Sequence, residues 1–299
     1  MELRQLEMFV EAADRHSITA AAQALYVAQP SVSARILALE KELGLPLFDR
    51  LPRGVRLTEV GHAVLPHARQ VLRHVAEIAD TVDALSGLQR GRLVFGTMPT
   101  ITAHLIPTAI KAFRSRHPAI DLRVVESSAT GILEQLAAHR LDLGVVTNAE
   151  ESPQINVEHL LSEELYAIVP VDDPLADRNE IDLRELRDRP FVVLEAGFSL
   201  RAVLWETCAR AGFSPRIAQE MSSIQGIKGL VEIGMGVSIA PRMSIEQEEH
   251  LGLLRALRLS QRPHRELQIV TARGAYLSRS AAAFIATCRE AAASMRAGA

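Results

Sequence analysis

Between residues 57 and 85, apolar or small residues recur at alternating spacings of four and three. The positions are Leu57, Gly61, Val64, Ala68, Val71, Val75, Ile78, Val82 and Leu85. This spacing predicts one long helix with a coiled-coil seam, capped at Thr58, bent slightly at Pro66 and ending near Ser86–Gly87. Because a single helix cannot bury such a stripe, the pattern predicts a partner helix, most simply that of a second copy of the chain.

The first helix expected ahead of this stripe ends at His16–Ser17. Its apolar side chains form one face at helical spacing: Leu3, Leu6, Phe9, Val10 and Ala13. Ser17 and Thr19 are N-cap candidates for a second helix, since a hydroxyl can accept a hydrogen bond from a free N–H of the first turn. The small residues Ala20–Ala22 let a neighbouring helix cross this second helix closely.

A third helix is expected to begin at Gln29–Pro30, since proline suits a first helical turn, and to stop at Gly44. Its buried stripe consists of Val32, Ile36, Leu39 and Leu43, and its outward side chains include Ser31, Ser33 and Arg35. A helix pair with a tight connection and a polar outer face is typical of a helix-turn-helix, whose second helix fits the major groove of DNA. The alternative is an ordinary helical hairpin with a solvated face.

Beyond Gly44, Pro52 and Gly54 are turn signals between two short extended pieces of residues 47–57, which predicts a small wing.

The overall net charge of -3 does not support DNA binding by charge alone. The charge is nevertheless segregated within residues 1–57, where Glu2 lies in an acidic start and Arg56 in a basic end. The chain is long enough, at 299 residues with 48% hydrophobic residues, to bury more than one core.

From residue 92 onward, short aliphatic runs alternate with amphipathic segments, which predicts an α/β domain with largely parallel sheets. The expected strands are 92–97, 120–126, 143–147, 165–170, 191–194, 216–220, 236–241 and 266–272. Polar breaks at 171–174 and 260–263 suggest two lobes, with a binding cleft between them. We therefore expect three parts: residues 1–57, a linker helix at 58–88, and residues 92–299. Lobe I is expected to span about 92–162 and 268–299, and lobe II about 163–267.

Hydroxyl, amide and guanidinium side chains stand where the predicted strands end and helices begin. They are Thr100, Ser127, Ser128, Thr147, Ser199, Arg201, Ser222, Ser223 and Gln225. Free backbone N–H groups and positive dipole ends at such places bind carboxylate or phosphate groups. Plain N-capping explains any single one of these serines, but several of them on one cleft favour a ligand site.

Signals for enzymes and for membrane or metal proteins are weak. The segment 236–240 resembles a nucleophile elbow, but residues 237–241 read as a strand closed by proline. Gly234 and Gly236 precede a strand, so they do not form a dinucleotide loop. Spacings of 5 and 7 between His62, His67 and His74 do not bring three metal ligands to one point. No run of 18 uncharged apolar residues and no signal peptide is present, so we expect a cytoplasmic protein without a membrane partner. The two cysteines lie far apart, so we expect both to be reduced. We also expect no cofactor and no metal.

The segment at 21–33 reads AAQALYVAQPSVS, and it is followed by Ile36, Leu39–Glu40, Leu43–Gly44, Leu47–Phe48, Arg50, Leu57–Thr58 and Gly61. In these residues the chain closely resembles the LysR-type transcriptional regulators. The resemblance extends over nearly the whole chain, since the order of helix-turn-helix, long helix and two-lobed α/β domain is also that of the family. Two departures are Ala28 and Ala129, where relatives often have a hydroxyl.

The resemblance implies a winged helix-turn-helix, a dimerising linker helix and an effector-binding domain similar to type 2 periplasmic binding proteins. It implies that Gln29, Pro30, Ser31 and Arg35 read the major groove of double-stranded DNA, that Ser33 holds a phosphate and that Arg53 enters the minor groove from the wing. Arg50 and Thr58 are candidates for contacts with the DNA backbone. The implied partners are an interrupted palindrome in DNA, further copies of the chain as a dimer or tetramer, and RNA polymerase.

By the same resemblance, the effector-binding residues are Thr100, Ser128, Thr147, Ser199, Arg201, Ser223 and Gln225. We expect the effector to be a small anionic metabolite, because the cleft pairs helix N-termini with Arg201 and offers few aromatic surfaces. The rival interpretation is a solute-binding receptor or a small-molecule enzyme whose N-terminal helices serve only dimerisation. The polar face of Ser31, Ser33, Arg35 and Arg53 discriminates between the two, because a pure dimerisation module has no reason to keep it polar.

Overall fold

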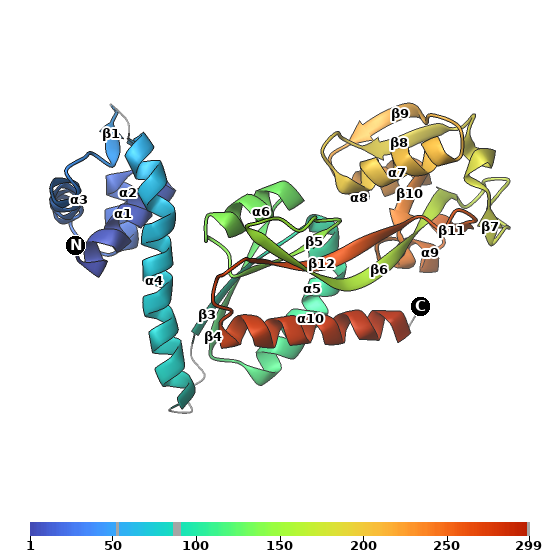
Figure 1. The fold of residues 1–299 in the computed structure, drawn as a ribbon. Coiled ribbons are helices and arrows are strands. Elements are labelled where there is room, and N and C mark those ends of the chain that lie inside the picture. The colour runs from blue at the N-terminus through green and yellow to red at the C-terminus, as the bar shows by residue number, and fades with distance from the viewer. Residues whose placement is uncertain (52–53, 86–90, 298–299) are drawn as a thin grey trace.

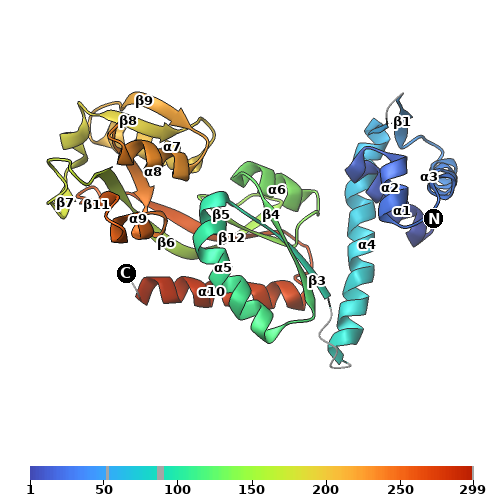
Figure 2. The ribbon, with the colours of Figure 1, turned by 180° about the vertical axis from the view of Figure 1, so that it is seen from behind.

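The computed structural model describes residues 1–51, 54–85 and 91–297. A helical N-terminal domain packs on one end of a long helix, and lobe I of an α/β domain lies between that helix and lobe II (Figures 1 and 2). Among the described helices, none has the length and apolar character needed to cross a membrane.

The N-terminal domain consists of three helices and a two-stranded wing. Its elements are α1 (Leu3–Arg15), α2 (Ile18–Ala24), α3 (Gln29–Leu43), β1 (Phe48–Arg50) and β2 (Val55–Leu57). The strands β1 and β2 pair antiparallel, and the rings of Phe9 and Phe48 pack edge to face at 5.4 Å in the core beneath them. The expected helix-turn-helix and wing are therefore present.

Local signals set the ends of these helices. Ser17 caps α2, since its Oγ accepts a hydrogen bond from the N–H of Ala20 at 3.2 Å. The prediction of Thr19 as a cap was wrong, because Thr19 lies inside α2. Only the residue just before a helix has its side chain beside the free N–H groups of the first turn. Ala28 is the N-cap of α3 and supplies no side-chain bond, and Gly44 ends α3 with φ 76°.

The long helix α4 (Glu59–Leu85) begins at the predicted cap. The N–H of Gly61 donates to Thr58 Oγ1 at 3.0 Å. The expected seam divides in two. Its first part packs on the helix's own N-terminal domain, where Ala68 is buried and Val64 is half-buried, whereas Val71, Val75 and Ile78 are 39%, 38% and 66% exposed. A partner helix is thus needed only beyond Ala68.

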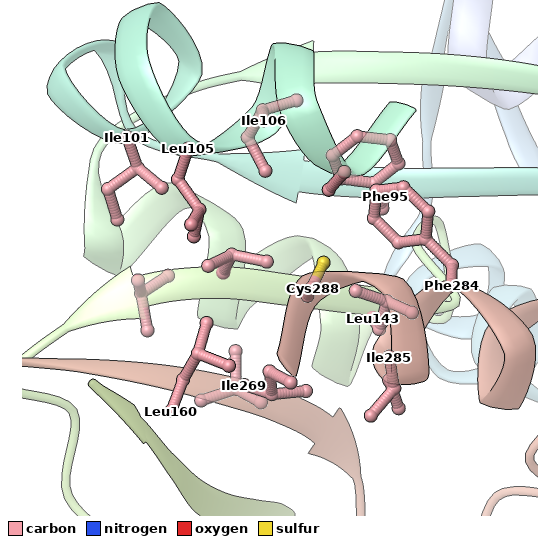
Figure 3. Close-up of a cluster of buried hydrophobic side chains, with 14 of the residues drawn as sticks. Phe95, Ile101, Leu105, Ile106, Leu143, Leu160, Ile269, Phe284, Ile285 and Cys288 are labelled. Atoms are coloured by element: carbon pink, nitrogen blue, oxygen red, sulfur yellow. The ribbon is translucent and has the colours of Figure 1, made fainter. Parts of the chain in front are cut away.

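Lobe I surrounds one hydrophobic core. Its elements are β3 (Gly91–Thr97), α5 (Pro99–Arg116), β4 (Ile120–Glu126), α6 (Ala129–Ala137), β5 (Leu143–Thr147), the first half of β6 (Ile155–Pro170), β12 (His264–Ala272) and α10 (Arg279–Ala297). Figure 3 shows this core, in which the rings of Phe95 and Phe284 lie 4.4 Å apart above Cys288.

Lobe II has a separate core. Its elements are the second half of β6, β7 (Glu180–Ile181), η1 (Leu183–Leu186), β8 (Pro190–Leu194), α7 (Ser199–Arg210), β9 (Arg216–Met221), α8 (Ile224–Glu232), β10 (Ser238–Pro241), η2 (Arg242–Ser244), α9 (Glu246–His250) and β11 (Leu254–Leu259). Lobe I and lobe II name these two sets of elements below.

The sheets are mixed, so the expectation of largely parallel sheets was wrong. The large sheet has the order β4-β3-β5-β12-β6-β11-β7, and β6 pairs antiparallel with β12, β11 and β10. The named strands pair parallel as β3 with β4 and β5, β8 with β9, and β11 with β7. The strand β6 runs from lobe I into lobe II and pairs antiparallel with β12 of lobe I, and these two strands form the hinge (Figure 1).

The predicted strand at 165–170 was too short, and β7 and β11 were missed. The strand β6 begins at Ile155, but in its first half exposed polar residues such as Asn156 and Glu158 interrupt the buried apolar ones. Polar side chains on the solvent face of an antiparallel strand interrupt the apolar run on which the prediction depended.

Candidate functional site

The outward face of α3 carries the residues expected to read DNA. Gln29, Pro30, Ser31 and Arg35 are exposed, and Ser33 is half-buried. Arg35 donates to a carboxylate oxygen of Glu2 at 2.8 Å, and both side chains are largely exposed. Since an exposed ion pair contributes little stability, Arg35 can exchange Glu2 for a DNA phosphate or base at small cost.

The remaining DNA candidates lie on or near the wing. Arg53 and the side chain of Arg50 lie outside the part of the chain that the structure describes. The hydroxyl of Thr58 donates to the carbonyl oxygen of Pro46 at 2.7 Å and accepts the N–H of Gly61, so both of its hydrogen-bonding roles serve the junction of wing and linker helix.

Tyr26, which the sequence analysis did not single out, is an exposed aromatic residue next to α3. It lies in the turn between α2 and α3, has φ 54° and is 96% exposed. The available signal was an aromatic residue in the turn itself, where the left-handed backbone turns its side chain away from the core.

The second group of candidates lines a cleft between the lobes. A cavity of about 690 Å³ is lined by Ser128 and Thr147 from lobe I and by Ser199 and Arg201 from lobe II. The hydroxyl oxygens of Thr147 and Ser199 lie 2.8 Å apart, so a hydrogen bond joins the two lobes across this cavity.

A smaller cavity of about 130 Å³ continues between the starts of α5, α7 and α8. It is lined by Thr100, Ser223 and Gln225, and it shares Ser199 with the larger cavity. The seven predicted effector residues therefore lie around one composite site, which we call the interlobe cleft.

The hydroxyls of this cleft differ in what they bond. Ser128 and Ser223 accept N–H groups of Gly131 and Gly226, both at 3.2 Å, so simple N-capping explains these two serines. The helix α7 has Phe198 as its N-cap and no side-chain cap, and Ser199 in its first turn bonds Thr147 instead. Capping therefore does not explain Ser199.

Arg201 is bound within lobe II. Its guanidinium donates to the carbonyl oxygen of Leu194 at 2.8 Å and to Glu220 at 2.9 Å, and it lies 4.4 Å from the ring centre of Trp205. Hydrogen bonding to Arg201 lowers the pKa of Glu220. The charge of Arg201 is therefore already compensated, and the positive ends of the helices provide the stronger attraction for an anion.

Arg265, which sequence reasoning missed, is the buried cation of the smaller cavity. It is 3% exposed and donates to Glu163 at 2.8 Å and to the hydroxyl of Thr100 at 2.9 Å. Glu163 also accepts the N–H of Met243 at 2.9 Å. The Arg265–Glu163 pair joins β12 to β6 at the hinge. The two residues lie 102 positions apart, so no local sequence signal connects them.

Burial is the main cause of the pKa shifts of Glu163 and of the neighbouring His104. Burial raises the pKa of Glu163, while Arg265 and the N–H of Met243 oppose that rise. Burial, followed by the charges of Lys228 and Arg265, lowers the pKa of His104, which lines the same cavity. The cleft therefore presents His104 as a neutral imidazole at pH 7.

The serine of the segment that resembles a nucleophile elbow lies inside a strand. Ser238 is 1% exposed at the start of β10, which includes Pro241. A nucleophile needs an exposed position on a sharp turn between strand and helix, so this geometry does not provide one.

Comparison with known proteins agrees with this architecture. Residues 3–62 match the family model of the bacterial regulatory helix-turn-helix proteins of the lysR family, and residues 86–293 match that of the LysR substrate binding domain. The transcriptional dual regulator GltC of Bacillus subtilis is 34% identical over 251 residues, which cover 83% of this chain and 83% of GltC.

Two solved structures share the fold. Full-length OxyR from Pseudomonas aeruginosa superposes with a TM-score of 0.81 at 25% identity, covering 98% of this chain and 94% of OxyR. The effector-binding domain of QuiR in complex with shikimate has a TM-score of 0.62 at 22% identity and covers 69% of this chain and 98% of that domain. The chain belongs to the LysR family of transcriptional regulators, with a DNA-binding helix-turn-helix domain followed by a domain that binds a small-molecule effector, and it is not an enzyme.

Proposed function

We propose that the interlobe cleft binds a small anionic metabolite and that this binding sets the spacing of two DNA-binding domains on an interrupted palindrome. The observation that carries the proposal is the Thr147–Ser199 hydrogen bond, because it couples closure of the lobes to the residues that line the cleft. A ligand that bonds these hydroxyls changes the relative stability of the open and closed lobes, as allosteric control requires.

The anionic character rests on the starts of three helices. The first turns of α5, α7 and α8 all line the smaller cavity, so their free N–H groups and positive dipole ends act on the same volume. These helix ends would attract a carboxylate in place of Arg201, because Glu220 already compensates the charge of Arg201. That QuiR was solved with shikimate, a carboxylate, is consistent with this class of ligand.

Calorimetric titration of the full chain tests this class. One series uses mono- and dicarboxylates, and a matched series uses the corresponding uncharged amides. We expect heat of binding for at least one carboxylate and a loss of more than tenfold in affinity for its amide. Binding of the amides alone would contradict the proposal.

We propose that two chains pair through the exposed part of α4 and that dimers associate further into tetramers. The exposed apolar residues Val71, Val75 and Ile78 support the pairing, because a continuous apolar stripe on a helix is stabilised by a second helix. Sedimentation should give a dimer or tetramer for the wild type and smaller species for Val75→Lys/Ile78→Lys. An unchanged mass would contradict pairing through α4.

For DNA, we propose that Gln29, Pro30, Ser31 and Arg35 read bases, that Ser33, Arg50 and Thr58 contact the backbone and that Arg53 enters the minor groove. We expect Arg53→Ala to weaken specific binding by about 1 to 3 kcal/mol without unfolding the protein. Binding to the DNA upstream of its own gene, across a salt series and against scrambled competitor, measures this. Action on promoters implies a cytoplasmic location and RNA polymerase as a partner.

A further inference from the structure

A separate cavity of about 670 Å³ lies between the N-terminal domain with its linker helix and lobe I. Its walls come from α1 and α4 on one side, and from β3, β4 and the end of α6 on the other. None of its lining residues lines the interlobe cleft. Figures 1 and 2 show α4 on the side of lobe I that faces away from lobe II.

Arginine dominates the charge of this cavity. The lining includes Arg15, Arg69, Arg73, Arg92, Arg123 and Arg140. Its carboxylates are Glu11, Asp14 and Asp142, which leaves an excess of three positive charges. A cavity with such an excess of positive charge attracts anions.

The carboxylates of the cavity are already bound. Glu11 pairs with Arg15 along α1, and Asp14 pairs with Arg69 and, at 3.4 Å, with Arg140. Asp142 accepts the N–H of Val94 at 2.7 Å. These contacts tie Glu11 and Asp14 to Arg15, Arg69 and Arg140, and neither carboxylate is paired with Arg92 or Arg123.

Arg92 and Arg123 are the two cations best placed for a ligand. Both are exposed, and neither forms an ion pair or side-chain hydrogen bond with another residue in the described part of the chain. Arg123 pairs in register with Val94, and Arg92 and Val94 share one face of β3, so both arginines face the cavity from neighbouring strands.

The opposite wall is held in place by Arg69. Its side chain is 6% exposed and pairs with Asp14 of α1. It also donates to the carbonyl oxygen of Ala138 in lobe I at 3.2 Å, so it joins the N-terminal domain to lobe I beside the cavity. Both domains therefore line the cavity.

We propose that this cavity is a second ligand site, for a small anion that carries two or three negative charges, such as a phosphorylated or polycarboxylate metabolite. Planar guanidinium groups bind such oxyanions with paired N–H donors. A ligand held by Arg92 and Arg123 on lobe I and by Arg73 on α4 fixes the N-terminal domain against lobe I. The site thereby controls the DNA-binding domain independently of the interlobe cleft.

Calorimetric titration of the full chain with pyrophosphate and with citrate, at constant ionic strength, tests the proposal. We expect saturable binding of at least one of these anions, and a loss of tenfold or more in the double variant Arg92→Gln/Arg123→Gln. The matched control, Arg187→Gln/Arg216→Gln, removes two exposed arginines of lobe II and should stay within twofold of the wild type. Circular dichroism confirms that both variants are folded.

Two further variants locate the site. Arg35→Gln tests the DNA-binding face and Ser199→Ala tests the interlobe cleft, and both should keep the wild-type affinity for the anion. Absence of binding to the wild type, an equal loss in the cavity and control pairs, or a loss that follows Arg35 or Ser199 instead would each overturn the proposal.

Discussion

Thr147, at the end of β5, and Ser199, at the start of α7, share a hydrogen bond of 2.8 Å that joins the two lobes. Thr147 is 1% exposed and Ser199 is half-buried, so the bond is partly shielded from water within the interlobe cleft. Under the proposed function, an effector that replaces or reinforces this polar contact would favour one arrangement of the lobes over the other.

This contact predicts a measurable coupling between the two residues. The variants Thr147→Val and Ser199→Ala, alone and combined, should show a coupling free energy of about 0.5–1.5 kcal/mol in urea unfolding. The chain's single tryptophan, Trp205, lies on α7 and reports the unfolding of lobe II. As a control, Thr271→Val, on the part of β12 that pairs with the start of β6, should not couple with Ser199→Ala. Equal coupling in both cycles would refute the contact.

The buried pair at the hinge should dominate the stability of the α/β domain. Arg265→Met leaves Glu163 buried without its cation, which costs about 3–5 kcal/mol of unfolding free energy. Arg289→Met breaks an exposed pair with Glu158 and should cost less than about 1 kcal/mol. Denaturant unfolding of both variants tests the difference, and similar costs would show that Arg265 does not support the hinge.

His104 should make the protein less stable in acid. Because its pKa is lowered in the folded state, the unfolded chain binds the proton first as the pH falls below about 6.5. The folded state therefore loses stability between pH 7.5 and 5, and His104→Gln should lose less over that range. Melting temperatures of the two proteins from pH 9 to 5 provide the test. They should run parallel above pH 7.5, and parallel curves down to pH 5 would contradict the prediction.

Both cysteines should be unreactive in the folded protein. Cys208 and Cys288 are fully buried, and burial raises the pKa of each thiol to about 12. Since the thiolate is the reactive form, a thiol reagent such as dithionitrobenzoate should modify neither in the native state and both in denaturant. Rapid modification of either cysteine in the native protein would show an accessible thiolate and suggest redox sensing.

Local signals predicted the helix ends of the N-terminal domain well and the hinge poorly, although Leu43, expected in the buried stripe of the third helix, is 40% exposed at the end of α3. Ser17 and Gly44 mark helix ends through bonds and backbone angles that involve only nearby residues, so they can be read from sequence. The long strand β6 and the Arg265–Glu163 pair depend on antiparallel pairing between distant segments, and exposed polar residues conceal that pairing. The cleft residues were predictable as a group because helix starts after strands gather at one edge of a sheet. Which hydroxyl caps its own helix and which crosses the cleft was decided only by tertiary packing.

DNA footprinting tests most directly whether ligand binding in the interlobe cleft changes DNA binding. The wild type and Ser199→Ala are compared on the DNA upstream of the regulator's own gene, with and without the carboxylate found by calorimetry. We predict that the ligand changes the footprint of the wild type and that Ser199→Ala, although it still binds DNA, needs at least tenfold more ligand for the same change. An identical ligand response in the two proteins would contradict control through the interlobe cleft.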